Sequence, residues 1–142
     1  PGFEESTGGR LPGWEPPADA TAWSIDRQER HSGNAALSLV SQQRPVGVCS
    51  QNIQPANGRQ LIFTAWLKGD RDSRDPRVRL TLEGQSGGSP FQYTAEVQLS
   101  SAWQHYQLRT NRLPGTEQLQ ARLRIQLLAP GKLWIDDVAL LE

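Results

Sequence analysis

Apolar residues in this chain recur at every second position along its glycine- and proline-free stretches. Segments 77–83 and 119–127 place apolar side chains on one parity and polar side chains on the other. In 61–68 one parity is apolar, and the other mixes Ile62 and Trp66 with Thr64 and Lys68. No segment of helical length keeps apolar residues at a 3.6-residue period. Period 2 is typical of β-strands that pack one face on a core and turn the other toward solvent.

Turn-forming residues separate these stretches, as at Asn57-Gly58 and Pro130-Gly131. Segment 84–90 is rich in glycine and is predicted to connect two strands. An all-β fold follows, a β-sandwich jelly roll of two antiparallel sheets. The predicted strands are 22–26, 35–41, 46–53, 61–68, 77–83, 91–99, 103–109, 119–127 and 132–141.

Length and composition narrow the class of protein. The 142 residues predict a single domain, 1–142, that can bury a core without disulfides. Fifteen basic and fifteen acidic residues cancel, which argues against a nucleic-acid partner. The single cysteine, Cys49, excludes an internal disulfide and is predicted to be buried. No apolar run reaches membrane-spanning length, so we expect no membrane association.

The ends of the sequence carry further signals. The chain has no signal peptide and begins abruptly at Pro1, so we interpret it as a module excised from a longer protein. Glu4 and Asp136 each lie beside large apolar residues near opposite ends of the chain. If the two ends meet in the fold, these carboxylates can hold one hard cation. The alternative is that both are ordinary surface acids.

Signatures of catalysis are missing from the sequence. His31 and His105 lie in unlike contexts without metal-ligand spacing, and no nucleophile elbow, phosphate loop or dinucleotide fingerprint occurs. We therefore expect the domain itself to be non-catalytic, whatever the activity of its parent protein.

The order of motifs along nearly the whole chain resembles the calcium-binding carbohydrate-binding modules of families 4, 9, 16 and 22. The resemblance implies a β-sandwich jelly roll, a structural calcium ion, a sugar-binding cleft on a concave sheet and an extracellular location. Matching positions imply that backbone carbonyls of Gly2, Ser32 and Ala35 complete the calcium shell around Glu4 and Asp136. The motifs are Pro1-Gly2-Phe3-Glu4, Gly13-Trp14, His31-Ser32-Gly33, Ala36–Leu39, Gln51, Gly58, Phe63–Lys68, Trp103 and Trp134–Val138.

A sugar-binding face needs flat aromatic rings and polar side chains that can reach hydroxyl groups. Period 2 turns Trp66 outward from its sheet. Phe91 and Tyr93 share a parity with apolar neighbours, so they face the core unless a bulge near Pro90 changes the phase. Gln51 enters through the resemblance. The candidate ligand-binding residues are Trp66, Arg79, Phe91, Tyr93, Arg124, Gln126 and Gln51.

The outward arginines leave two interpretations open. Arg79, Arg122 and Arg124 can form a basic stripe that recognises acidic sugars. Alternatively, they belong to a solvated face balanced by Glu83 and Glu96.

The leading functional hypothesis is a non-catalytic module that binds polysaccharide or oligosaccharide and targets an attached catalytic domain to it. A structural or protein-interaction jelly-roll module is the alternative, since fold does not fix function. A small glycan-active enzyme is a third reading.

Overall fold

The computed structural model describes residues 13–33, 35–42, 45–50, 52–53, 60–72, 76–111, 113 and 119–141. Gly2 and Glu4 of the predicted cation site, and Gln51 of the predicted ligand site, lie outside these residues.

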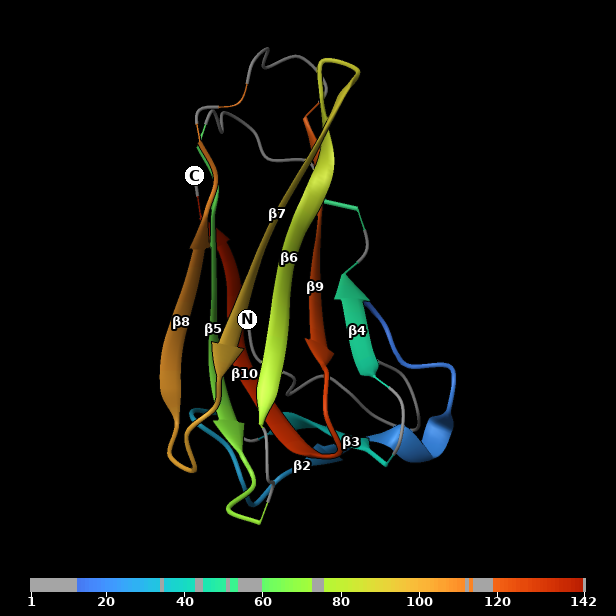
Figure 1. Ribbon diagram of the computed structural model, residues 1–142, viewed down its shortest axis with the longest axis vertical. Helices are drawn as coiled ribbons and strands as arrows, with labels where there is room; N and C mark the ends of the chain where they lie inside the picture. The colour runs from blue at the N-terminus through green and yellow to red at the C-terminus, as the bar shows by residue number, and fades with distance from the viewer. Residues whose placement is uncertain are drawn as a thin grey trace.

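The described residues form two antiparallel five-stranded sheets packed face to face (Figure 1). A three-residue 3₁₀ turn, η1 (Ala20–Ala22), precedes β2. The first of the two sheets is here called the β6 sheet. Its strand order is β1 (Trp14–Glu15), β4 (Val46–Ser50), β9 (Gln120–Leu127), β6 (Arg77–Ser86), β7 (Ser89–Gln98). In the second, the β5 sheet, it is β2 (Trp23–Asp26), β3 (Ala36–Ser41), β10 (Gly131–Leu141), β5 (Ile62–Gly69), β8 (Gln104–Arg109).

The predicted all-β sandwich is confirmed, and the strands fall close to their expected positions. The glycine-rich segment differs from the expectation, because β6 continues through Gly84 and β7 already begins at Ser89. Only Gly87 and Gly88 form the turn, with φ of 57° and 85°, a backbone region that glycine adopts without strain. The two strands therefore make one long hairpin instead of two strands joined by a loop.

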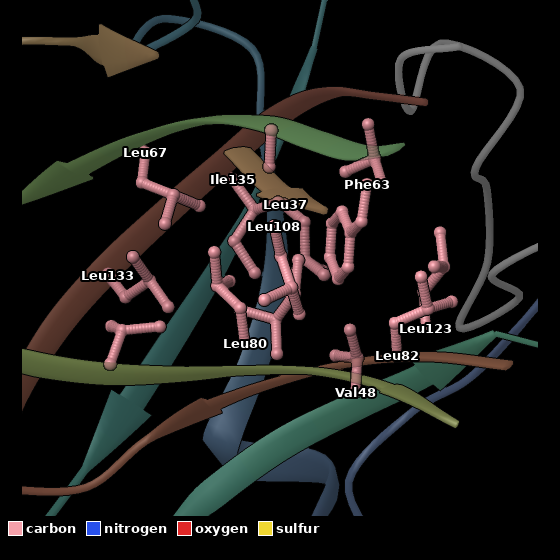
Figure 2. Packing of buried hydrophobic residues seen from close by; sticks show 14 of the residues in the cluster. Leu37, Val48, Phe63, Leu67, Leu80, Leu82, Leu108, Leu123, Leu133 and Ile135 are labelled. Carbon is pink, nitrogen blue, oxygen red and sulfur yellow. The ribbon is translucent and has the colours of Figure 1, made fainter. Parts of the chain in front are cut away.

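The core lies between the sheets and consists of the apolar side chains that the alternating sequence pattern turned inward. Phe63 and Leu67 of β5 face Leu80 and Leu82 of β6, and all four are fully buried (Figure 2). Burying each such side chain contributes about 1.5–3 kcal/mol relative to exposing it. This alternation fixes which residues each sheet turns outward. Among the described residues, no helix is long and apolar enough to cross a membrane.

Candidate functional site

The outer face of the β6 sheet carries polar and charged side chains in cross-strand rows. Arg79 of β6 lies between Gln126 of β9 and Glu96 of β7, and Thr81 lies opposite Arg124. Arg79, Arg124 and Gln126 thus point outward, as predicted. They belong to adjacent strands of one sheet and form one continuous surface.

Each of three outward arginines on this face is paired with a glutamate. The Nη2–Oε1 distances are 2.7 Å for Arg79–Glu96 and 3.0 Å for Arg124–Glu83. The third guanidinium belongs to Arg122, whose Nη2 lies 2.6 Å from Glu15 Oε1 and whose Nε donates to a backbone carbonyl. These pairs favour the balanced, solvated face over a bare basic stripe.

A hollow of about 520 Å³, here called the face hollow, lies on the outer side of the β6 sheet near the β6–β7 hairpin. Gln92 donates its Nε2–H to Glu83 Oε2 at 3.3 Å within it. At Gly84 the backbones approach so closely that an added Cβ would lie 1.9 Å from the Gln120 carbonyl oxygen. The lining residues are Asn52, Glu83, Gly84, Gln85, Pro90, Phe91, Gln92, Gln120 and Arg122.

The two aromatic candidates of β7 occupy different environments. The β6–β7 register is continuous from Arg77–Gln98 to Ser86–Ser89, so no bulge changes the phase at Pro90. Tyr93 is directly opposite the buried Leu82 and packs against the core. Tyr93 is partly buried and does not line the face hollow. Phe91 has the same parity but is partly exposed at the sheet end, where it lines the face hollow.

Trp66 lies on the other side of the molecule. It points outward as predicted, but from β5, which belongs to the opposite sheet. Trp66 therefore does not line the same sheet face as the candidates Arg79 and Arg124. The ring of His31 stacks on Trp66, and the rings of Trp103 and His105 lie nearby. Trp66 is a packing centre between β5 and the loop that carries His31.

Asp136 is buried where β10 meets that loop. Its Oδ2 accepts the backbone N–H groups of His31 and Ser32, both at 3.0 Å, and its Oδ1 accepts the N–H of Asp137 at 2.8 Å. Burial is the largest influence and raises the pKa of the Asp136 carboxyl, although the three N–H donors oppose it. The structure thus brings together Asp136 and Ser32, two members of the predicted cation site.

The Asp136 carboxylate has room for one further partner. A carboxylate offers about four lone-pair positions, and three are used by the described N–H groups. A buried carboxylate with a free position fits a hard cation held jointly with another oxygen ligand. Ala35 is fully buried just beyond the loop. The described residues alone contain no group of three or more His, Cys, Asp or Glu side chains that could hold a metal.

Asp137 fastens the same loop from its exposed side. Its carboxylate accepts the Ser32 hydroxyl at 2.8 and 2.6 Å and lies 2.7 Å from His31 Nδ1. Its φ of 48° is in the left-handed region, next to a register shift between Asp136 and Ala139. The two adjacent aspartates therefore both hold this loop, Asp136 from its buried side and Asp137 from its exposed side.

Sequence reasoning did not select Gln85, Gln92 and Gln120, which line the face hollow. Parity could have found Gln92, since it alternates with the inward Phe91. Parity also turned Gln120 outward on the predicted strand 119–127, whereas Gln85 could not be placed, because segment 84–90 was expected to be a loop.

No family model and no curated protein sequence matches this chain. Solved structures do. The carbohydrate-binding module TmCBM61, solved in complex with β-1,4-galactotriose, is 19% identical with a TM-score of 0.68, covering 100% of this chain and 94% of its own. The CBM22-1 xylan-binding domain of Paenibacillus barcinonensis Xyn10C is 16% identical with a TM-score of 0.67, covering 98% and 89%. A family 16 module, CBM-2, is 11% identical with a TM-score of 0.63, covering 85% and 86%. The chain therefore has the β-sandwich fold of carbohydrate-binding modules.

Proposed function

We propose that this domain is a non-catalytic carbohydrate-binding module that holds a glycan on the outer face of the β6 sheet, centred on the face hollow. The observation that carries the proposal is the set of amide, carboxylate and apolar side chains that line this hollow, on a sheet of the carbohydrate-binding-module fold. The fold neighbours that bind galactotriose and xylan support the ligand class.

The chemistry of the face hollow suits a sugar. Sugar hydroxyls both donate and accept hydrogen bonds, and the amides of Gln85, Gln92 and Gln120 can do the same. Glu83 accepts hydroxyl protons, while Phe91 and Pro90 offer apolar surface to the C–H face of a ring. Described outward positions of this sheet include no aromatic side chain, so recognition rests mainly on hydrogen bonds.

Affinity electrophoresis through gels containing xylan, galactan, mixed-linkage glucan or mannan tests the proposal. We expect retardation in at least one gel and its loss in Gln92→Ala. Gln107→Ala is the matched control, since Gln107 is an exposed glutamine on β8 of the opposite sheet. Migration unaffected by every gel, or equal sensitivity of the two variants, contradicts the proposed site.

The domain is also proposed to bind without cleaving. The same glycans should release no reducing ends during prolonged incubation with the purified domain. Any glycan-dependent turnover that survives repeated purification would favour the enzymatic alternative.

A structural calcium ion is the second part of the proposal. Glu4 and Asp136 would supply its charged ligands, and the carbonyls of Gly2, Ser32 and Ala35 would supply the rest. The position on the buried Asp136 carboxylate that the described residues leave open supports this assignment. An ion that binds only the folded state stabilises it by about 2.7 kcal/mol at one hundred times its dissociation constant. We expect EDTA to lower the melting temperature, calcium to restore it, and Glu4→Gln to remove the response.

The domain would act outside the cell by tethering an attached catalytic domain to polysaccharide. One solved neighbour supports this arrangement, because it joins a CBM22-1 module to GH10 in a Clostridium thermocellum xylanase, although this chain covers only 26% of that one. Tethering raises the effective concentration of substrate at the active site. A fusion to a catalytic domain should gain activity on insoluble but not soluble substrate, and the gain should vanish with Gln92→Ala.

A further inference from the structure

A second hollow, of about 570 Å³, lies at the edge of the sandwich and is here called the edge hollow. It sits where β3 of one sheet leads toward β4 of the other, beside the segment that carries η1 (Figure 1). It shares no lining residue with the face hollow. Its lining residues are Pro17, Ala18, Asp19, Thr21, Ala22, Val40, Gln42, Pro45, Val46 and Gly47.

Most of this lining is apolar. Val40 is one of two large apolar side chains that the described part of the chain leaves exposed, at 36%. It lies within β3, whose other residues are all buried, so its exposure is specific to this position. Pro17, Pro45 and Val46 add further C–H surface. The volume lies within the range of about 300–1,000 Å³ that is typical of small-molecule sites.

A few polar groups converge on the apolar floor. Asp19 Oδ1 accepts both the backbone N–H of Thr21, at 2.9 Å, and the Thr21 hydroxyl, at 2.7 Å. These two bonds lower the pKa of the Asp19 carboxyl, which therefore stays ionised at neutral pH. The Gln42 amide supplies both a donor and an acceptor.

We propose that the edge hollow is a second glycan-binding site, which takes a short uncharged oligosaccharide. The fixed carboxylate of Asp19 accepts hydroxyl protons but repels carboxylate or sulfate groups. The prolines and valines suit the C–H face of a sugar ring. The ligand class rests on the proposed function, whereas the location does not, because the two hollows are separate.

A domain with two such sites binds a polysaccharide surface more tightly than it binds a short oligosaccharide. One short ligand occupies one site at a time, while neighbouring chains of an insoluble polymer can occupy both. The second binding event is then intramolecular and benefits from effective concentration.

Amide chemical-shift mapping of the ¹⁵N-labelled domain tests the inference. The probes are xylose, galactose, β-1,4-galactotriose and xylohexaose, and a galacturonic acid trimer serves as the charged comparison. We expect saturable shifts at Thr21, Val40, Gln42 and Gly47 with an uncharged probe, separate from any at Gln92. The charged trimer should leave the edge residues unshifted, and equal titration by it overturns the inference.

Two variants sharpen the experiment. Asp19→Asn keeps an acceptor for the Thr21 N–H but removes the charge, and Val40→Ser removes exposed apolar surface without opening the core. Each should weaken binding at the edge residues by roughly tenfold, since a hydrogen bond to a charged group or a buried apolar contact is lost. Asp70→Asn is the matched control, because Asp70 also accepts a backbone N–H two residues on.

The outcomes separate the two proposals. Shifts at the edge residues that weaken in both variants but not in Asp70→Asn support the inference. Shifts confined to Gln92 and its neighbours overturn it and leave the proposed function standing. Shifts confined to the edge residues support it and overturn the site on the β6 sheet. An unshifted spectrum with every probe overturns it, and retardation in the polysaccharide gels then decides the proposed function separately.

Discussion

The imidazole of His31 lies nearly parallel to the indole of Trp66, with ring centroids 3.8 Å apart and an interplanar angle of 15°. Hydrogen bonds at both ends hold His31 there, since its N–H donates to Asp136 and its Nδ1 contacts Asp137. The outward face of Trp66 is therefore covered by the chain's own loop. A tryptophan that points outward from its sheet is therefore not necessarily accessible to a ligand.

Trp66→Ala should lower stability without changing glycan affinity. The substitution removes the stacking partner of His31 and the ring neighbour of His105, on the sheet opposite the face hollow. We expect a loss of about 2 kcal/mol, less than for a fully buried aromatic because Trp66 is partly exposed. Urea unfolding and affinity electrophoresis measure the two properties on one sample. A folded variant that fails to bind glycan would return Trp66 to the binding site.

The sequence predicted well which way side chains point from their strands, but poorly which strands share a sheet. Alternation correctly turned Phe63 and Leu80 inward and Arg79 and Arg124 outward, because the period of a strand is a local property. It could not tell that β5 and β6, consecutive in the chain, enter opposite sheets. That assignment depends on the order β9-β6-β7, which is set by contacts far apart in sequence. For this reason Trp66 and Arg79 were listed together as ligand-binding candidates although they lie on opposite sheets.

Resemblance and composition contributed in opposite ways. The resemblance grouped Asp136 with Ser32 around a calcium ion, which stays a prediction. The structure joins the two residues by the Ser32 N–H, a contact spanning 104 residues that no local pattern encodes. Composition misjudged Gly84, because glycine in sequence suggests a loop while here it permits a close approach of two paired strands. The face hollow was missed along with it.

Gly84→Ala tests the close approach of β6 and β9. A Cβ at this position would lie 1.9 Å from the Gln120 carbonyl oxygen and 2.8 Å from its carbonyl carbon, and a backbone neighbour cannot rotate away. We expect a loss of at least about 2 kcal/mol in the free energy of unfolding, in the range of overpacking and strain. Gly88→Asn serves as the control, since nothing lies within 4 Å and asparagine tolerates its φ of 85°. Equal costs for the two variants, measured by urea unfolding, would contradict the close approach.

Asp136→Ala should cost more than Asp137→Asn, even with excess EDTA present. The first substitution leaves the N–H groups of His31, Ser32 and Asp137 without their buried acceptor, at about 1–3 kcal/mol for each group left unpaired. The second keeps an acceptor for the Ser32 hydroxyl and a residue that tolerates positive φ. We expect at least about 3 kcal/mol against about 1 kcal/mol. The chelator separates this effect from the proposed calcium ion, and a reversed order would show that the outer carboxylate holds the loop.

The Arg79–Glu96 pair should contribute little to stability despite its 2.7 Å separation. Both side chains are more than 40% exposed, at 43% and 45%, so water and salt screen their attraction. A double-mutant cycle with Arg79→Ala and Glu96→Ala should give a coupling energy below about 1 kcal/mol that falls further in molar salt. A larger, salt-independent value would mean that the ladder of ion pairs on this face is a rigid unit.

The final prediction concerns acid. Burial alone would raise the pKa of the Asp26 carboxyl, but the N–H groups of Glu29 and Gln28, the Trp134 indole and the charge of Lys132 lower it overall. A depressed pKa in the folded state contributes stability that is present above the unfolded value of about 3.9 and is lost as the pH falls through the folded value. The stability advantage of the native domain over Asp26→Asn should therefore shrink from pH 7 toward pH 3. Urea unfolding across that interval measures it, with Gln107→Ala as the non-titrating control. A gap between wild type and Asp26→Asn that stays constant, or widens toward acid, would mean that Asp26 is not held ionised by the Trp134 indole and the two backbone N–H groups.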